Sequence, residues 1–203
     1  MKKQMLALAL IILLTIPFAS YAVTPMETVR ADINKVLDVL RDPSLKGESG
    51  KKIKKTKIRS LAKEMFGFDE LSRRTLGQNW KRLNADQQKE FTDLYASLLE
   101  ETYANRLLSY TNEKVRYGKE TPLSGKTVEV ETTIVTTQGA DIPINYRVVQ
   151  KDGDWKVYDV VIEGVSLIDN YRSQFNRIIK RESYDALVKK MRRKLDEDNT
   201  KSS

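Results

Sequence analysis

The 203-residue chain contains no cysteine and no histidine. Without these residue types there can be no disulfide, no cysteine nucleophile, no Ser-His-Asp triad and no zinc or haem held by His or Cys. The sequence also lacks a D-x-D-x-D-G calcium loop, a G-x-x-x-x-G-K-[ST] phosphate loop and a G-x-G-x-x-G nucleotide motif. Only carboxylate, lysine and oxygen-ligand chemistry remains, so we predict neither an enzyme nor a cofactor.

Long apolar runs are scarce as well, and the clearest one stands at the N-terminus. Two lysines precede an apolar run over residues 6–16, and a small-x-small exit ends at Ala22. The run is shorter than the ~20 residues that span a bilayer, and the pattern is typical of a secretory signal peptide; an uncleaved anchor is the alternative. We expect residues 1–22 to be the signal peptide and residues 23–203 to form one exported domain.

Basic residues outnumber acidic ones, 36 to 28, giving a formal net charge of +8. They crowd residues 51–59 and 189–194. One interpretation is attraction to anionic membrane surfaces or acidic partner patches, screened beyond about 8 Å at physiological salt. The other is a solvated helix face that keeps the protein soluble. Nucleic acid is not expected as a partner of an exported protein.

Apolar periodicity predicts helices first and strands afterwards. Helical stripes run over residues 26–40, 53–66, 68–80 and 87–110, and again after the last strand. Thr24 before a proline and the Asn84 to Gln87 box are expected N-caps, and Ser183 is expected to cap a final helix.

Alternating apolar residues then predict strands over residues 128–134, 142–148 and 155–162, with a shorter edge strand at 115–117. Gln138-Gly139 and Asp152-Gly153 are the expected turns. The predicted class is α+β, an antiparallel sheet of about four strands with helices gathered largely on one face.

The segment over residues 153–175, GDWKVYDVVIEGVSLIDNYRSQF, is the most informative in the chain. It predicts a strand that turns at Gly164 into an amphipathic helix. Period two places Trp155, Val157 and Val161 on one face and Tyr158, Val160 and Ile162 on the other. Both faces should therefore be covered by apolar groups.

Three segments together resemble the MlaC or toluene-tolerance family over roughly residues 26–195. They are the segment just described, FDELSRRTLGQNW at residues 68–80 and QQKEFTDLYASLLEETYANRLLSY at residues 87–110. The resemblance implies a periplasmic phospholipid carrier of the maintenance-of-lipid-asymmetry pathway. It implies a curved, nuclear-transport-factor-like sheet that encloses an apolar cavity. The implied partners are phospholipid, an inner-membrane ABC transporter with a ring of MCE-domain subunits and an outer-membrane lipoprotein-porin complex, with transient membrane association.

Block-by-block matching to the family also implies a set of lipid-contacting residues. These are Tyr95, Leu98, Leu99, Thr102 and Tyr103 from the long helix, Ile134, Ile144, Tyr146 and Val148 from the strands, and Val161, Val165 and Ile168 around the turn. A charge at Val165 should disrupt tail binding. The alternative is that these are ordinary core residues, because both interpretations need the same residue types.

Two other functions stay open on the sequence. One is an exported enzyme with a carboxylate inside the cavity, for which Asp159 is the obvious candidate. The other is a structural or adhesive envelope protein with a solid core that binds partners through its basic face.

Overall fold

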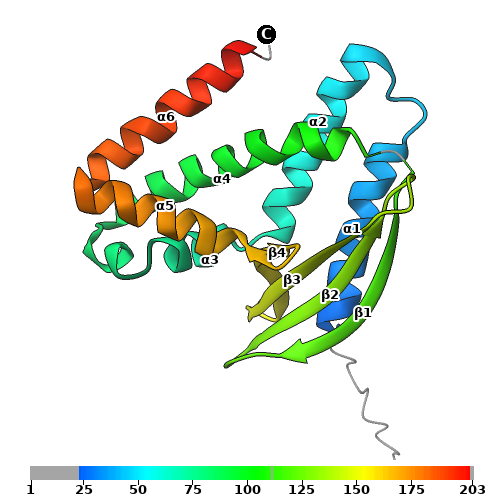
Figure 1. The fold of residues 1–203 in the computed structure, drawn as a ribbon, viewed down its shortest axis with the longest axis horizontal. Helices are drawn as coiled ribbons and strands as arrows, with labels where there is room; N and C mark the ends of the chain where they lie inside the picture. The colour runs from blue at the N-terminus through cyan, green and yellow to red at the C-terminus, as the bar shows by residue number, and fades with distance from the viewer. Residues whose placement is uncertain (1–22, 111, 202–203) are drawn as a thin grey trace, which may run out of the picture.

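The computed structural model describes residues 23–110 and 112–201, so the predicted signal peptide lies outside the described residues. In the described part, six α-helices, one 3-10 helix and five strands follow one another as Figure 1 shows. They are α1 (Pro25–Arg41), α2 (Gly47–Met65), α3 (Phe68–Leu76), η1 (Gly77–Arg82), α4 (Ala85–Leu108), β1 (Lys114–Pro122), β2 (Thr127–Val135), β3 (Asp141–Lys151), β4 (Asp154–Ile162), β5 (Val165–Ser166), α5 (Leu167–Arg181) and α6 (Tyr184–Lys201). The predicted α+β class is confirmed.

The helix starts follow the predicted capping residues. The Thr24 hydroxyl accepts from Glu27 N at 3.1 Å while the Glu27 carboxylate accepts from Thr24 N at 2.8 Å. Asn84 and Gln87 form the same reciprocal pair at 2.9 and 3.1 Å, which opens α4, the longest helix described. Ser183 caps α6 by accepting a backbone N–H at 3.0 Å. Each cap satisfies backbone donors that the first helical turn leaves free.

Removing the cap of α4 should cost measurable stability. We expect Asn84→Ala to lower the free energy of unfolding by about 1 kcal/mol, because Gln87 N loses its acceptor. Urea denaturation measures the change. Asn84→Ser, which keeps a side-chain acceptor, should stay within a few tenths of a kcal/mol of the unchanged protein; equal losses in both variants would contradict the capping role.

The sheet is antiparallel, with strand order β1-β2-β3-β4-β5. The predicted turns are confirmed: Gly139 has φ 81°, and Asp152 and Gly153 have φ 51° and 91°. Two details differ from the prediction. The edge strand β1 is nine residues long, and β4 does not lead straight into a helix. Glu163 and Gly164, with φ 49° and 82°, reverse the chain into the two-residue strand β5.

A bulge in β4 changes which side chains share a face. The register between β3 and β4 shifts between Arg147 and Val148, which leaves Tyr158 without an opposite residue. The extra residue reverses the alternation beyond it. Val157 and Val160 therefore pack in the same cluster, while Tyr158 packs in another. The prediction that Val157 and Val160 lie on opposite faces is wrong for this reason, although both faces of β4 are covered as expected.

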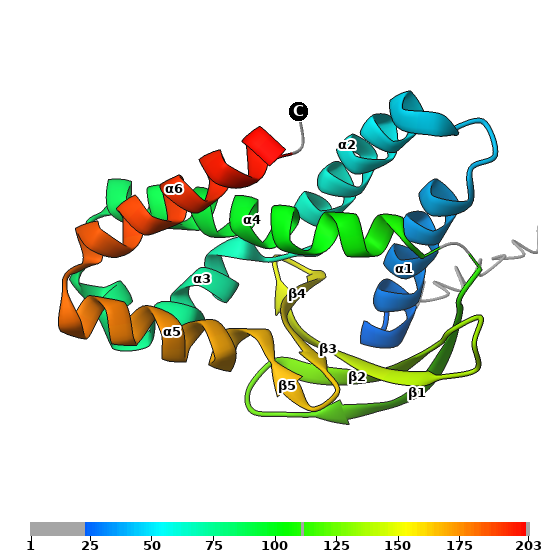
Figure 2. The same ribbon diagram turned by 45° about the horizontal axis from the view of Figure 1, so that its top comes forward.

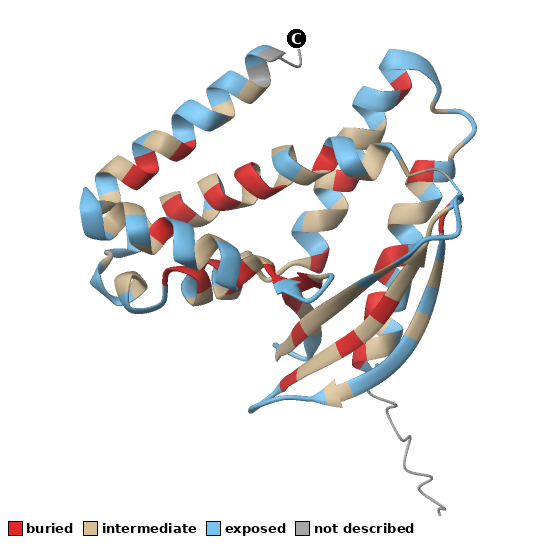
Figure 3. Cartoon of the chain, viewed as in Figure 1, coloured by how far each residue is buried: buried red, intermediate tan, exposed pale blue. Residues whose placement is uncertain are grey.

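Apolar packing divides into two regions. The helical core lies among α3, α4, α5, α6 and the outer face of β4, and contains Leu71, Leu76, Phe91, Tyr95, Leu98, Leu99, Tyr158, Ile168, Phe175, Leu187 and Met191. The sheet core lies between α1 and the sheet, and contains Val29, Ile33, Val130, Val148, Val157 and Val160. Figure 3 shows the buried positions running along α4 and through the middle of the strands.

Within residues 23–110 and 112–201, none of the helices combines the length and the apolar character needed to cross a bilayer.

Candidate functional site

A cavity of about 260 Å³ lies between the inner face of the sheet and helices α1, α2 and α4. Figure 2 shows the sheet curving beneath α1, with α2 and the second half of α4 on the other side of this space. The volume is close to the lower end of the range for small-molecule sites, about 300 Å³. The cavity adjoins both cores: Ile33 and Val160 of the sheet core line it, and so does Leu99 of the helical core.

The sheet wall of the cavity is apolar because inward-facing residues of four adjacent strands, β1 to β4, contribute to it. Its side chains are Val115, Thr132, Ile134, Ile142, Ile144, Tyr146, Val160 and Ile162. The Thr132 hydroxyl donates to the carbonyl oxygen of Ile144, so it presents no free donor to the cavity. Burial raises the pKa of Tyr146 to about 12, which keeps its hydroxyl neutral at physiological pH. This wall therefore offers an uncharged surface.

The helical walls come from the apolar faces of three amphipathic helices. They contribute Ile33, Val36, Leu37 and Leu40 of α1, Ile58, Ala62 and Met65 of α2, and Leu99, Tyr103, Ala104 and Leu107 of α4. The spacings of three and four residues place each set on one helix face. Phe66 and Phe68, in the connection from α2 to α3, close one end. These faces of the three helices thus line one common space.

Charged side chains gather where α2 meets the second half of α4. Lys55 Nζ lies 2.8 Å from Glu101 Oε2, and Arg59 Nη2 lies 2.8 Å from Glu101 Oε1. Arg59 Nε approaches Glu100 Oε2 at 2.5 Å without the alignment of a hydrogen bond. Burial at the cavity wall raises the pKa of the Glu100 carboxyl, and this outweighs the opposing effect of Arg59. These ion pairs join two helices that bound the cavity.

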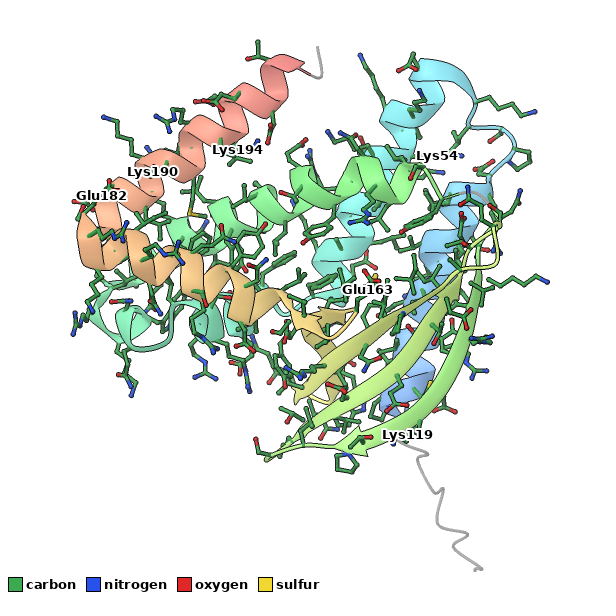
Figure 4. The ribbon with its side chains drawn as sticks, viewed as in Figure 1. Lys54, Lys119, Glu163, Glu182, Lys190 and Lys194 are labelled. Atoms are coloured by element: carbon green, nitrogen blue, oxygen red, sulfur yellow. The ribbon has the colours of Figure 1, made fainter. Side chains whose placement is uncertain are left out.

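Further charges stand at the edge of the cavity. Arg106 of α4 and Glu163, at the turn between β4 and β5, both line it and are exposed to solvent. Figure 4 labels Glu163, which lies at this turn beside the space between the sheet and the helices. The cavity thus combines an apolar interior with a charged rim, an arrangement suited to an amphipathic ligand.

The geometry gives little support to a carboxylate enzyme. Asp159, the predicted candidate, is 1% exposed and does not line the cavity. It accepts hydrogen bonds from Ser166 Oγ at 2.6 Å, Ile168 N at 3.1 Å and Arg147 Nη1 at 3.1 Å. The carboxylates that do line the cavity are Glu100, Glu113 and Glu163. Among the residues that the structure describes, no group of three acidic side chains could hold a metal ion.

The model of the family described as MlaC protein matches residues 30–193, most of the described chain. The chain belongs to the MlaC family. The resemblance inferred from three sequence blocks is thereby confirmed.

Two known proteins and one solved structure are similar to this chain. The intermembrane phospholipid transport system binding protein MlaC of Haemophilus influenzae is 30% identical over 58% of this chain, and the match spans 57% of that protein's length. Toluene tolerance protein ttg2D of Pseudomonas putida is 22% identical over 87% of this chain and 83% of its own. A phospholipid-binding protein of Ralstonia solanacearum, solved in complex with a phospholipid, is 28% identical with a TM-score of 0.72, over 87% of this chain and 97% of that one.

Five of the twelve residues predicted from the MlaC resemblance line the cavity together. They are Leu99, Tyr103, Ile134, Ile144 and Tyr146. They come from α4, β2 and β3, so the long helix and these strands border the same space. Their contact with lipid stays a prediction.

The other seven predicted residues lie elsewhere in this MlaC-family fold. Tyr95, Leu98 and Ile168 are buried in the helical core, and Val148 is buried in the sheet core. Val161 is buried in β4, but it does not line the cavity. Thr102 is exposed, and its hydroxyl donates to the Leu98 carbonyl at 2.7 Å. Val165 is 58% exposed in β5, so a charge there would face solvent.

The walls formed by α1 and α2 were missed. Their apolar stripes predict helices with one buried face, but the stripes alone do not indicate that the face lines a cavity. The available signal was the apolar face of α1, Ile33, Val36, Leu37 and Leu40, which another element has to cover. In this structure the cavity wall includes this face of α1 as well as α4.

Proposed function

We propose that this protein is a non-enzymatic periplasmic carrier that holds the acyl tails of a phospholipid in the cavity. The observation that carries the proposal is the cavity itself, which has aliphatic and aromatic walls from three helices and four strands and a charged rim. Membership of the MlaC family and the similarity to a phospholipid-bound structure support phospholipid as the cargo.

The energetics explain why a carrier needs such a space. Each methylene is worth about 0.8 kcal/mol when buried, so exposing two acyl chains of ordinary length to water would cost on the order of 20 kcal/mol. A flat apolar surface cannot cover both sides of a chain, whereas a cavity can. The phosphate would stay at the rim, where water and charged groups solvate it.

The proposed tail contacts are the cavity-lining residues of both wall types. They are Leu99, Tyr103, Ile134, Ile144 and Tyr146, together with the apolar faces of α1 and α2. The buried and exposed residues outside the cavity, Val165 among them, have no part in this proposal.

The proposal extends to the cellular setting. A signal peptide over residues 1–22 would deliver a single domain to the periplasm. There the carrier would shuttle phospholipid between an outer-membrane lipoprotein-porin complex and an inner-membrane ABC transporter with an MCE-domain ring, maintaining outer-membrane lipid asymmetry. Contact with the membranes would be transient, and no cofactor is required.

Lipid content tests the function directly. Protein purified from cells without detergent should yield phospholipid in organic extracts analysed by mass spectrometry, in near-stoichiometric amount. After delipidation, it should take up labelled phospholipid from liposomes. A protein that contains no phospholipid and takes up none would contradict the carrier function and favour a structural envelope protein.

A further inference from the structure

A second hollow, of about 740 Å³, lies between α3, η1 and α5, away from the lipid cavity. These elements lie side by side in Figures 1 and 2. The lining includes six basic residues and no acidic one. The six are Arg73, Arg74, Lys81, Arg82, Arg172 and Lys180. We call this feature the basic hollow.

Hydrogen bonds between the two walls fix the shape of the basic hollow. Asn79 Nδ2 donates to Asn176 Oδ1 at 2.7 Å, which links η1 to α5. The Arg172 guanidinium donates twice to the Arg74 carbonyl oxygen, at 2.9 and 3.1 Å, which links α5 to the end of α3. Gly77 lets the chain turn from α3 into η1 with φ 55°, a value that L side chains rarely adopt. The hollow is therefore a formed feature of the fold.

Half of the cations around the hollow are already paired. Arg73 and Arg74 both contact Glu70 at 2.6 Å, and Arg172 contacts Asp169 at 2.7 Å.

The other three cations, Lys81, Arg82 and Lys180, are exposed, and no ion pair involves them within the described ranges. A concave surface lined by unneutralised charges of one sign concentrates counter-charges. The hollow should therefore attract an anionic ligand.

The dimensions indicate which anionic ligand fits. Arg172 and Lys180 are eight residues apart on α5, about 12 Å along the helix axis. One phosphate group would fill only part of this length, whereas successive carboxylates on an extended peptide, which rises about 3.3 Å per residue, can follow it. A bilayer surface is flat and would meet the rim without entering the hollow.

Apolar groups in the same lining point to a protein partner. Trp80 and Ile179 are half-buried there, beside the arginines. Tryptophan and arginine are the residues most enriched at energetically important positions of protein interfaces. We propose that the basic hollow binds an acidic, extended segment of a partner protein, independently of the lipid cavity.

A labelled acidic peptide tests this docking site. Fluorescein-labelled deca-glutamate is titrated with the purified protein, and binding is followed by anisotropy at low and high salt. Combined reversal of the unpaired cations, Lys81→Glu, Arg82→Glu and Lys180→Glu, should weaken binding at least about tenfold at low salt. The same variant should keep its thermal midpoint and its bound lipid, because all three side chains are exposed and none lines the cavity.

The matched control reverses three exposed lysines outside the hollow, Lys46→Glu, Lys52→Glu and Lys126→Glu, with the same change in net charge. It should bind the peptide like the unchanged protein. Equal weakening in both variants would overturn the proposal in favour of non-specific charge attraction.

Two further probes separate the other anionic ligands. If phosphatidylglycerol vesicles lose binding to the hollow variant while the peptide does not, the surface is a membrane contact and the proposal fails. If inorganic phosphate alone binds and the peptide does not, it is a small-anion site and the proposal fails. Should the reversal variant not fold, the glutamine replacements at the same positions serve instead, with a smaller expected loss of peptide binding.

Discussion

Replacing Ile144 by glutamate should empty the cavity of phospholipid while the protein stays folded. Ile144 lies in β3 in the sheet wall of the cavity, and its backbone is held by β4 and by the hydroxyl of Thr132. A carboxylate placed against acyl chains costs several kcal/mol, and every 1.4 kcal/mol is a factor of ten in affinity. We therefore expect lipid retention to fall by at least about a hundredfold, measured as phospholipid per protein in organic extracts and as uptake from liposomes.

The control for this prediction is Val165→Glu, which adds the same charge at a position that is 58% exposed and outside the cavity lining. It should retain lipid, whereas the family resemblance alone led us to expect that a charge at Val165 disrupts tail binding. Full lipid retention by Ile144→Glu would show that the tails bind elsewhere. Loss of lipid from both variants would mean that the β4–β5 turn takes part in binding. If Ile144→Glu does not fold, Ile144→Trp, which fills space without charge, provides the same test.

The order and class of the elements could be predicted because each signal is local. The caps at Thr24 and Asn84 and the turn at Asp152 depend on residues within a few positions of each other. The bulge at Tyr158 and the strand β5 could not be predicted in the same way. Both depend on pairing with β3 or β4, and period-two alternation assumes that no residue is skipped.

The cavity could be predicted only in part, because α4 has different neighbours in its two halves. Its apolar residues follow one pattern from Phe91 to Leu107, but Tyr95 packs against Tyr171 and Phe175 in the helical core, whereas Tyr103 and Leu107 line the cavity. Helical periodicity identifies the buried face and does not indicate what covers it. A side chain that lines a cavity and one that fills a core therefore look alike in the sequence, which is why Tyr95 and Ile144 received the same prediction.

Removing the carboxylate of Asp159 should destabilise the protein by about 3 kcal/mol. This side chain is 1% exposed and lies where β4 meets α5. It accepts from Ser166 Oγ, the N-cap of α5, and from Ile168 N, and it pairs with Arg147 at 3.1 Å. In Asp159→Ala, the buried Ser166 hydroxyl and the Ile168 N–H lose their acceptor together, whereas Arg147 keeps Glu129 at 2.8 Å. Removing a buried acceptor lowers the free energy of unfolding, because the buried donors that it served are left without a hydrogen bond to protein or to water.

The same carboxylate joins the two regions of the molecule, because β4 belongs to the cavity wall and Ile168 belongs to the helical core. Asp159→Asn keeps the shape and one acceptor, so it should lose less than Asp159→Ala. The control is Asp154→Ala. Asp154 lies on the same strand but is exposed, and its Oδ2 lies 3.9 Å from Lys156 Nζ. This substitution should change the free energy of unfolding by less than about 0.5 kcal/mol. Urea denaturation of the three variants tests this order. If Asp159→Ala were no less stable than Asp154→Ala, the junction would be held by apolar packing, and Asp159 would have no structural role there.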